Sequence, residues 1–178
     1  MAAPDVSHPI PPHFASEFYL WLWWASEVNE GVFHTPEGPI QLWSQDRLAF
    51  RRPDESRVSA VMSGSNPAAA LESRAALRGG KNIAELHIGI RRDDREFHLS
   101  LKGLAVDYSN LKLPSILAET PEEAVIDRMF AVEEVHGIVA SLIREFARLR
   151  LGSSWPVTAA MMRIWAVESP GDADDDVD

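Results

Sequence analysis

Residues 81–102, KNIAELHIGIRRDDREFHLSLK, decide the fold, because their pattern predicts a hairpin of two antiparallel strands with a well-defined register. If Asp93 and Asp94 form a two-residue turn, every apolar residue on one side meets an apolar partner. The apolar pairs are Ile90 with Phe97, Ile88 with Leu99, and Leu86 with Leu101. The other side pairs Arg91 with Glu96, Gly89 with His98, His87 with Ser100, and Glu85 with Lys102. Because a one-residue slip would exchange the two sides, we expect one core face and one face for solvent or a partner, with a slightly longer loop as the alternative turn.

Shorter β-prone runs flank this hairpin. Four lie upstream, at residues 31–35, 39–45, 47–52 and 57–63, and one lies downstream at 104–109. Proline, glycine and charged residues separate them, which is typical of strands joined by turns. Together with the hairpin, these runs predict an antiparallel β-sheet meander.

Helices are predicted at both ends of the sheet region and in its middle. Residues 14–28 contain few helix breakers and form an N-terminal aromatic helix. The middle helix follows Asn66 as N-cap, with Pro67 at its first position and two glycines, Gly79 and Gly80, as its end.

A third, long helix begins after Thr120, which acts as N-cap with Glu123 completing a capping box, and ends at Gly152. About 30 helical residues extend roughly 45 Å. That is longer than a compact domain of this size needs, so we expect the helix to span the sheet or to protrude toward another chain. Residues 153–167 are predicted as a short helix or strand.

The aromatic stretch EFYLWLWWAS at residues 17–26 needs a partner that buries it. Its apolar run, residues 18–25, is far shorter than the roughly 20 residues that span a bilayer, so no membrane span is expected. Aromatic residues that stack on bases usually stand singly on strands or loops among basic residues. We therefore expect these side chains to form a core or a subunit interface.

The whole chain of 178 residues is enough for one α+β domain with a hydrophobic core. We expect an extended arm at 1–13, the domain at 14–152, a short extension at 153–167 and a disordered acidic tail at 168–178. Six of the 27 acidic residues follow Arg163, the last basic one, so the tail accounts for most of the formal charge of −10. The tail is either simply solvated or competes with nucleic acid for a basic surface. The N-terminus lacks a basic stretch followed by an apolar one, so an unexported, cytoplasmic protein is expected.

Signals for catalysis are sparse. The chain has no cysteine, which excludes thiolate chemistry, and none of the common phosphate-loop, nucleophile-elbow or zinc-protease motifs occurs. A His87, His98 and Glu85 metal site is conceivable, but surface residues explain this pattern better. A metal-dependent nuclease or exonuclease built on Asp93, Asp94 and Glu96 is a third and weaker alternative. We expect no catalytic residue, no metal and no cofactor.

Basic residues gather in and around the hairpin, within an otherwise acidic protein. Arg47, Arg51 and Arg52 end one predicted strand, and a second group extends from the middle helix through the hairpin: Arg74, Arg78, Lys81, Arg91, Arg92, Arg95 and Lys102. Such a surface can meet phosphates without reading bases, with an affinity that falls steeply with salt. The alternative is an ordinary charged sheet face with cross-strand pairs.

In the order of these features the sequence resembles the recombination-associated protein RdgC family. The resemblance covers about residues 14–152. It rests on the helix EFYLWLWWASE, the segment QDRLAFRR, the hairpin ALRGGKNIAELHIGIRRDDREFHLSLKG, the step LKLP and the terminal helix MFAVEEVHGIVASLIREFARLRLG. Gly80-Lys81 and Leu111-Lys112-Leu113 are its most specific pieces, and none is a catalytic signature. Family members are considerably longer, and the N-terminal half that helps to build their ring has no counterpart here.

The resemblance implies a non-enzymatic protein that dimerises around duplex DNA, has little sequence preference and restrains recombination driven by RecA. By position, it carries basic residues over to Lys81 and Lys112. We add the hairpin arginines Arg91, Arg92 and Arg95, together with Lys102, from their charge clustering. The resemblance thus implies a nucleoid-associated homodimer that binds the backbone of double-stranded DNA, and the charge clustering adds candidate contact residues. The alternative is a protein-interaction module that has lost DNA binding and uses the long helix for a partner and the acidic tail for solubility or DNA mimicry.

Overall fold

The computed structural model describes residues 13–54, 57–63, 71–115 and 118–167. The helices are α1 (Phe14–Val28), α2 (Leu71–Arg78), α3 (Pro121–Leu151) and α4 (Trp155–Val167). The strands are β1 (Val32–Thr35), β2 (Gly38–Arg51), β3 (Ala60–Ser63), β4 (Asn82–Arg92), β5 (Arg95–Lys102) and β6 (Asp107–Lys112). The predicted α+β class is confirmed, as are the aromatic helix, the middle helix and the long helix. The predicted arm except His13, the caps Asn66 and Pro67, and the predicted tail lie outside the described residues.

The hairpin of β4 and β5 has the register that its sequence predicts. Ile90 lies opposite Phe97, Ile88 opposite Leu99 and Leu86 opposite Leu101, and the last pair before the turn is Arg92 with Arg95. The turn therefore consists of two residues. Asp93 adopts a φ of 53°, in the left-handed region that aspartate tolerates better than most residues.

The sheet is antiparallel, and its strand order is β1-β2-β4-β5-β6, with β3 on the outer edge of β2. The order departs from a simple meander because the predicted runs at 39–45 and 47–52 form one long strand, β2. Its first part pairs with β1 and its last part pairs with β3 on the same edge. Irregular register between Ser44 and Leu48 bends β2 between these two parts.

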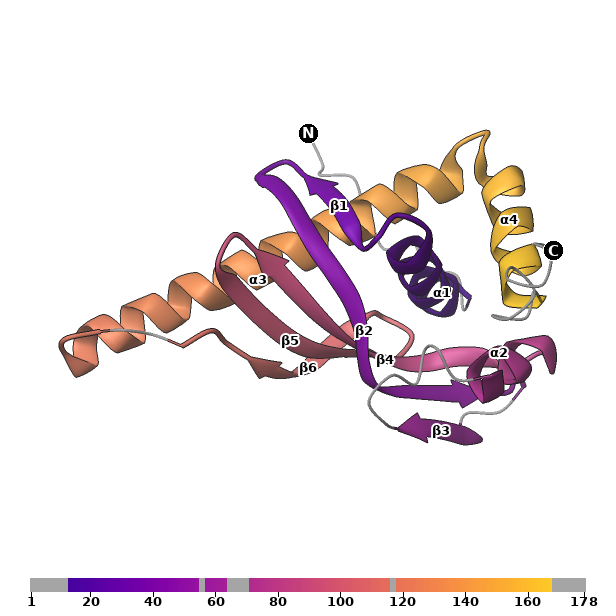
Figure 1. Ribbon diagram of the computed structural model, residues 1–178, viewed down its shortest axis with the longest axis horizontal. Helices are drawn as coiled ribbons and strands as arrows, with labels where there is room; N and C mark the ends of the chain where they lie inside the picture. Colours follow the sequence, from indigo (N-terminus) through magenta and orange to yellow (C-terminus); the bar gives the residue numbers. More distant parts are fainter. Residues whose placement is uncertain (1–12, 55–56, 64–70, 116–117, 168–178) are drawn as a thin grey trace, which may run out of the picture.

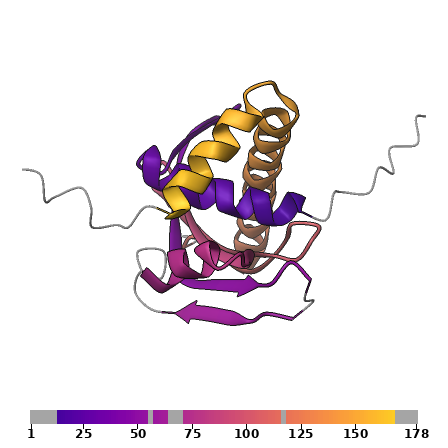
Figure 2. The ribbon, with the colours of Figure 1, turned by 90° about the vertical axis from the view of Figure 1, so that its right-hand side faces the viewer.

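Helices α1 and α3 cover one face of the sheet, α4 packs against the other helices, and α3 continues well beyond the edge of the sheet (Figure 1). Figure 2 shows α1 and α4 crossing beside the end of α3, with α2 near β3 and the end of β2. Thr120 and Glu123 form the predicted capping box of α3. None of the helices in the described part of the chain is long and apolar enough to cross a membrane.

The aromatic helix belongs to the core. Phe18, Tyr19 and Trp23 are at most 1% exposed, and they pack with the buried faces of the hairpin and α3. Phe146 of α3 lies between rings of α1 and α4, with Phe18 at 5.5 Å and Trp155 at 5.6 Å between centroids. Of the two predicted roles, core and subunit interface, the structure therefore assigns most of this stretch to the core.

Candidate nucleic-acid interface

The six basic residues proposed to contact DNA do not share one surface. Arg92 and Arg95 point to the helix-covered side of the hairpin. Lys81 lies at the far end of β4, next to α2 and α4. Arg91, Lys102 and Lys112 belong to the open face of the sheet, the side opposite the helices, where Arg91 pairs in register with Glu96 and Lys112 with His98.

Arg92 and Arg95 are held by carboxylates. Both guanidinium groups bind Glu134 of α3, with 3.3 Å between Arg92 Nη1 and Glu134 Oε1. Glu37 Oε2 lies 3.8 Å from the other terminal nitrogen of Arg92. Both Arg92 and Glu134 are only 14% exposed, so this contact connects the hairpin to α3 from inside the fold. The expectation that these two arginines point outward to phosphates is corrected accordingly.

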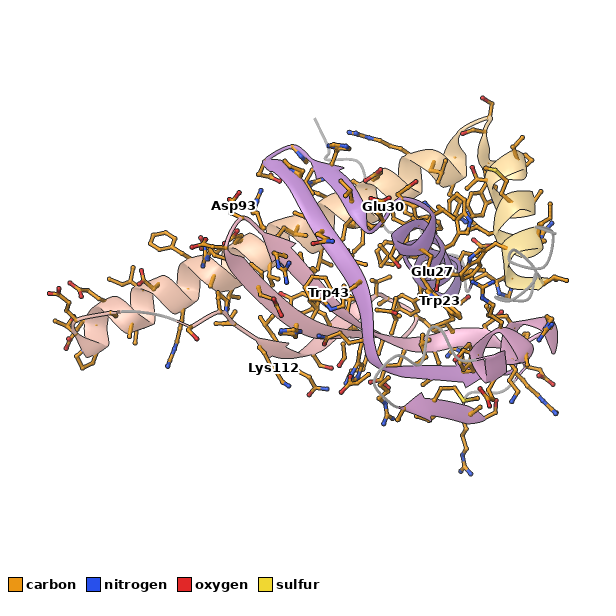
Figure 3. The ribbon with its side chains drawn as sticks, in the orientation of Figure 1. Trp23, Glu27, Glu30, Trp43, Asp93 and Lys112 are labelled. Carbon is orange, nitrogen blue, oxygen red and sulfur yellow. The ribbon has the colours of Figure 1, made fainter. Side chains whose placement is uncertain are left out.

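Arg91 does lie on the open face, but it is also paired. Its Nη2 is 3.2 Å from Glu96 Oε2, and its guanidinium carbon lies 5.5 Å from the centroid of the Trp43 ring. Figure 3 shows Trp43 on the open side of β2 and Lys112 on β6. A Cβ on Gly89 would come within 2.2 Å of this indole, so the glycine makes room for the ring. Sequence reasoning missed Trp43, because the fit between Trp43 and Gly89 depends on the β2–β4 register.

The two histidines of the open face bind carboxylates of neighbouring strands. His87 lies between Asp46, 3.1 Å from Nδ1, and Glu85, 3.0 Å from Nε2. His98 Nε2 is 2.9 Å from Glu96 Oε1. Within the described ranges, no group of three or more histidine, aspartate or glutamate side chains is placed to hold a metal ion. Neither the histidine metal site nor the nuclease site on Asp93, Asp94 and Glu96 therefore has the geometry it would need.

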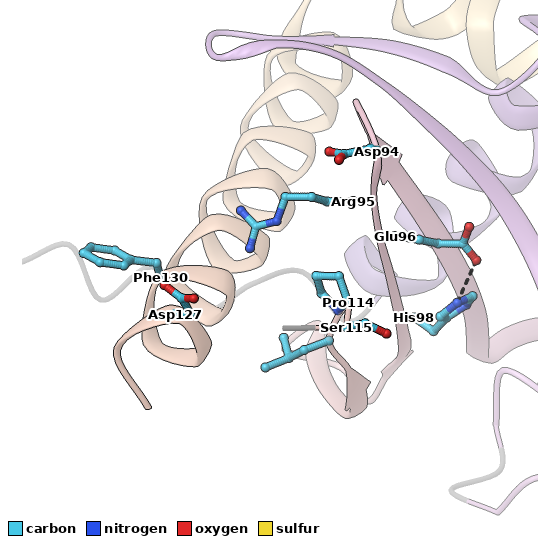
Figure 4. Close-up of a pocket in the computed structure, with 9 residues that line it drawn as sticks. Asp94, Arg95, Glu96, His98, Pro114, Ser115, Asp127 and Phe130 are labelled. Atoms are coloured by element: carbon cyan, nitrogen blue, oxygen red, sulfur yellow. Dashed lines mark ion pairs between the residues drawn. The ribbon is translucent and has the colours of Figure 1, made fainter. Parts of the chain in front are cut away.

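Two hollows beside β5 contain carboxylates. A shallow one of about 330 Å³ is lined by Trp43, Ser44, Gln45, Asp46, His98 and Lys112. A larger groove of about 730 Å³ lies between the hairpin tip and α3, with Asp94, Glu96 and Asp127 in its walls. Figure 4 shows Arg95 reaching across this groove toward α3, and the ion pair between Glu96 and His98. Carboxylates in both walls oppose the approach of a polyanion.

A third pocket, which we call the basic pocket, has a different chemistry. Its volume is about 350 Å³, and the charged residues in the described part of its lining are all basic: Arg78, Lys81 and Arg163. Apolar side chains of Leu20, Leu77, Ile83, Ala166 and Val167 complete it with Ser16, Gly80 and Asn82. Cations from α2, the start of β4 and α4 therefore surround an apolar floor.

Local chain geometry explains how these cations meet. Gly80 has a φ of 77° and ends α2 in a conformation that favours glycine, so the chain turns directly into β4 at Lys81. Arg163 belongs to α4, which packs on α2. Arg74 of α2 connects the two helices, because its guanidinium group donates to the Trp165 carbonyl at 3.1 Å and also binds Glu27 of α1 at 2.8 Å. Arg51 on β2 lies opposite Asn82, one residue from Lys81.

The cations of the basic pocket are available to bind an anionic ligand. Among the residues that the structure describes, none of Arg78, Lys81 and Arg163 has a carboxylate within ion-pair distance. The charge clustering in the sequence already contained Arg78 and Lys81. Arg163 could not be found that way, because more than 80 residues separate it from Lys81 and only packing of α4 brings it there.

Among the described residues, two groups outside the basic pocket have pKa values shifted from their ordinary ones. Burial raises the pKa of Tyr19 far above its ordinary value of 10.0, Asp107 adds to the effect, and Arg51 opposes it. The Tyr19 hydroxyl donates to the Gly103 carbonyl at 3.1 Å. Burial also raises the pKa of Glu145 on α3, against a lowering effect of His34. Neither group lines a pocket described above.

No protein-family model, no curated protein and no solved structure matches this chain.

Proposed function

We propose that this chain is a non-enzymatic, sequence-nonspecific DNA-binding protein of the RdgC type, linked to the regulation of recombination and replication. Its contact with the phosphate backbone is made at the basic pocket and not at the hairpin tip. The cellular setting that goes with this function is the nucleoid in the cytoplasm, with recombination proteins such as RecA as functional partners.

One observation carries the proposal: three cations, from α2, from the residue before β4 and from α4, line one pocket, and none of the described residues in its wall is acidic. Phosphate oxygens are bound by such groups without any reading of base sequence. Lys81, which the resemblance singles out independently of the structure, is one of the three. Lys102 and Lys112 on the open face add weaker contacts, because carboxylates such as Asp46 and Glu96 stand close to that face.

Binding of a labelled mixed-sequence duplex, followed by fluorescence anisotropy across a salt series, tests this function. We expect Lys81→Glu and Arg163→Glu each to weaken binding about tenfold at low salt and to reduce the salt slope by about one. Arg144→Glu is the matched control, since it makes the same charge change at an exposed site on α3 that lies outside the basic pocket and outside the part of α3 that extends beyond the sheet. Equal losses in all three variants would reject the pocket as the contact.

An exposed surface on α3 supports the self-association that the first function includes, and a protein-interaction module that has lost DNA binding, the second candidate function, would use the same surface. The part of α3 beyond the sheet exposes large apolar side chains, and two of them, Met129 and Phe130, are each 60% exposed. Val125, Ile126 and Val132 belong to the same exposed group. We propose that this surface, the α3 tip, is where a second copy of the chain packs to form the homodimer. The α3 tip takes this role instead of α1, because most of the α1 aromatic side chains are buried.

The two candidate functions make opposite predictions for the duplex. A module that has lost DNA binding leaves the duplex free even at low salt, while substitutions at the α3 tip still change self-association. A DNA-binding homodimer shows both effects, each with its own set of residues.

A further inference from the structure

The basic pocket lies next to the point where the described chain ends. Val167, the last residue of α4, is in its wall. The eleven residues that follow, ESPGDADDDVD, contain six carboxylates and no base, and they lie outside the described residues. The most acidic segment of the chain is therefore attached to the wall of a pocket whose charged groups, among the described residues, are Arg78, Lys81 and Arg163.

We infer that residues 168–178 bind the basic pocket of their own chain and act as an intramolecular competitor of nucleic acid. Eleven residues reach at most roughly 40 Å, which is ample for a return to a pocket that includes Val167, the residue directly before them. Pro170-Gly171 is a pair that favours reversal of the chain. Aspartates 172 and 174–176 then supply carboxylates to Arg78, Lys81 and Arg163, and Val177 supplies an apolar group for the floor.

Tethering makes such a contact effective even when each ion pair is weak. Attachment through a short connection gives an effective concentration on the order of millimolar, so the segment competes with an external polyanion for the pocket. This regulatory role rests on the proposed DNA-binding function. The contact between the segment and the pocket does not, because it follows from charge and attachment alone.

Paramagnetic relaxation measures the contact directly. The chain has no cysteine, so Asp175→Cys provides a single site for a nitroxide label. We expect the label to broaden the amide signals of Lys81, Asn82 and Ile83 in the full chain, while the signals of Asp93 and Asp94 at the hairpin tip stay sharp. Adding Lys81→Glu and Arg163→Glu should restore the broadened signals.

Three results would overturn the inference. The first is an absence of broadening at residues 81–83. The second is broadening that persists unchanged in the charge-reversed pocket. The third is broadening that arises only between molecules, seen when labelled protein without ¹⁵N is mixed with unlabelled ¹⁵N protein, because that places the segment on a second copy.

A tail-neutral variant tests the regulatory consequence. It carries Glu168→Gln, Asp172→Asn, Asp174→Asn, Asp175→Asn, Asp176→Asn and Asp178→Asn. We expect the variant to bind duplex about tenfold more tightly than the wild type at low salt, and this gain to disappear when Lys81→Glu and Arg163→Glu are also present. A gain that survives the pocket substitutions would come from net charge and would contradict competition at the pocket.

The two sets of experiments separate the inference from the proposed function. If the label reports the contact but no variant binds duplex, DNA binding fails and the contact stands. If duplex binding depends on Lys81 and Arg163 but the label reports no contact, the function stands and the competitor role fails.

Discussion

At the residue scale, single positions are determined by contacts that the strand register creates. The clearest example is Gly89, whose missing side chain leaves room for the Trp43 indole on the open face. The glycine is visible in the sequence, and so is its place opposite His98. The contact between Gly89 and the Trp43 indole could not be predicted from the sequence, because the β2–β4 register that creates it could not be derived from local patterns.

Gly89→Ala is expected to lower the free energy of unfolding by about 1–2 kcal/mol, because the new methyl group displaces the indole from the sheet. Gly137→Ala is a matched control, since a Cβ at that position in α3 meets nothing within 4 Å. We expect the control to raise the free energy of unfolding by roughly 0.5–1 kcal/mol. Urea denaturation measures both, and a neutral or stabilising Gly89→Ala would contradict the packing described for Trp43.

Burial of Tyr19 makes stability depend on pH in the alkaline range. The folded-state pKa is raised above the ordinary value of 10.0, so above about pH 10 the unfolded chain releases a proton that the folded chain retains. The free energy of unfolding therefore falls as the pH rises through this range. The chain has two tyrosines, so Tyr108→Phe leaves Tyr19 alone for ultraviolet titration. We expect its tyrosinate absorbance to rise only together with unfolding; a rise near pH 10 in the folded protein would contradict the burial.

At the element scale, the hairpin was the most predictable part of the molecule. Its alternation fixes both register and turn, and the cap Thr120 with Glu123 fixes the beginning of α3. The fusion of two predicted strands into β2 was not predictable, because the charged and polar residues 44–47 look like a turn when read locally. The direction of Arg92 and Arg95 also escaped prediction, since it depends on Glu134 from a helix about 40 residues away.

Glu134 is the link between α3 and the hairpin, and its loss should be costly. Glu134→Ala leaves the nearly buried Arg92 without its nearest carboxylate, so we expect the free energy of unfolding to fall by about 2 kcal/mol. The neighbouring Glu133→Ala, an exposed site on the same helix, should change it by less than about 0.5 kcal/mol. Equal effects of the two substitutions in urea denaturation would show that the Glu134 contacts contribute nothing to the docking of α3.

At the scale of the whole molecule, one face of the sheet is covered by helices, and α3 extends beyond it with apolar side chains exposed. The length of α3 was predictable from its cap and its glycine stop. The convergence of α2, β4 and α4 on one basic pocket was not, because it depends on packing between segments far apart in the chain. Charge clustering in the sequence predicted a DNA contact at the hairpin tip, whereas the packing of α2, β4 and α4 favours a contact at Lys81 and its neighbours.

The α3 tip is the proposed interface of a homodimer. Ile126→Glu places a charge on this surface, and we expect it to weaken a homodimer at least tenfold in sedimentation equilibrium. Leu104→Glu, in the turn between β5 and β6, is matched in exposure, since both side chains are 51% exposed in the single chain. It should leave association unchanged. A dimer that tolerates Ile126→Glu, or that is lost equally in both variants, would exclude the α3 tip as its interface.

The most direct test of the central claim is to map duplex binding on the full chain by amide chemical shifts. A mixed-sequence duplex is added at low salt to ¹⁵N-labelled protein that carries the tail-neutral substitutions. If the basic pocket is the contact, the largest shifts occur at residues 78–83 and 163–167, and they are lost when salt is raised. Shifts that instead concentrate at residues 91–96 of the hairpin tip, or that are absent throughout, would contradict the account.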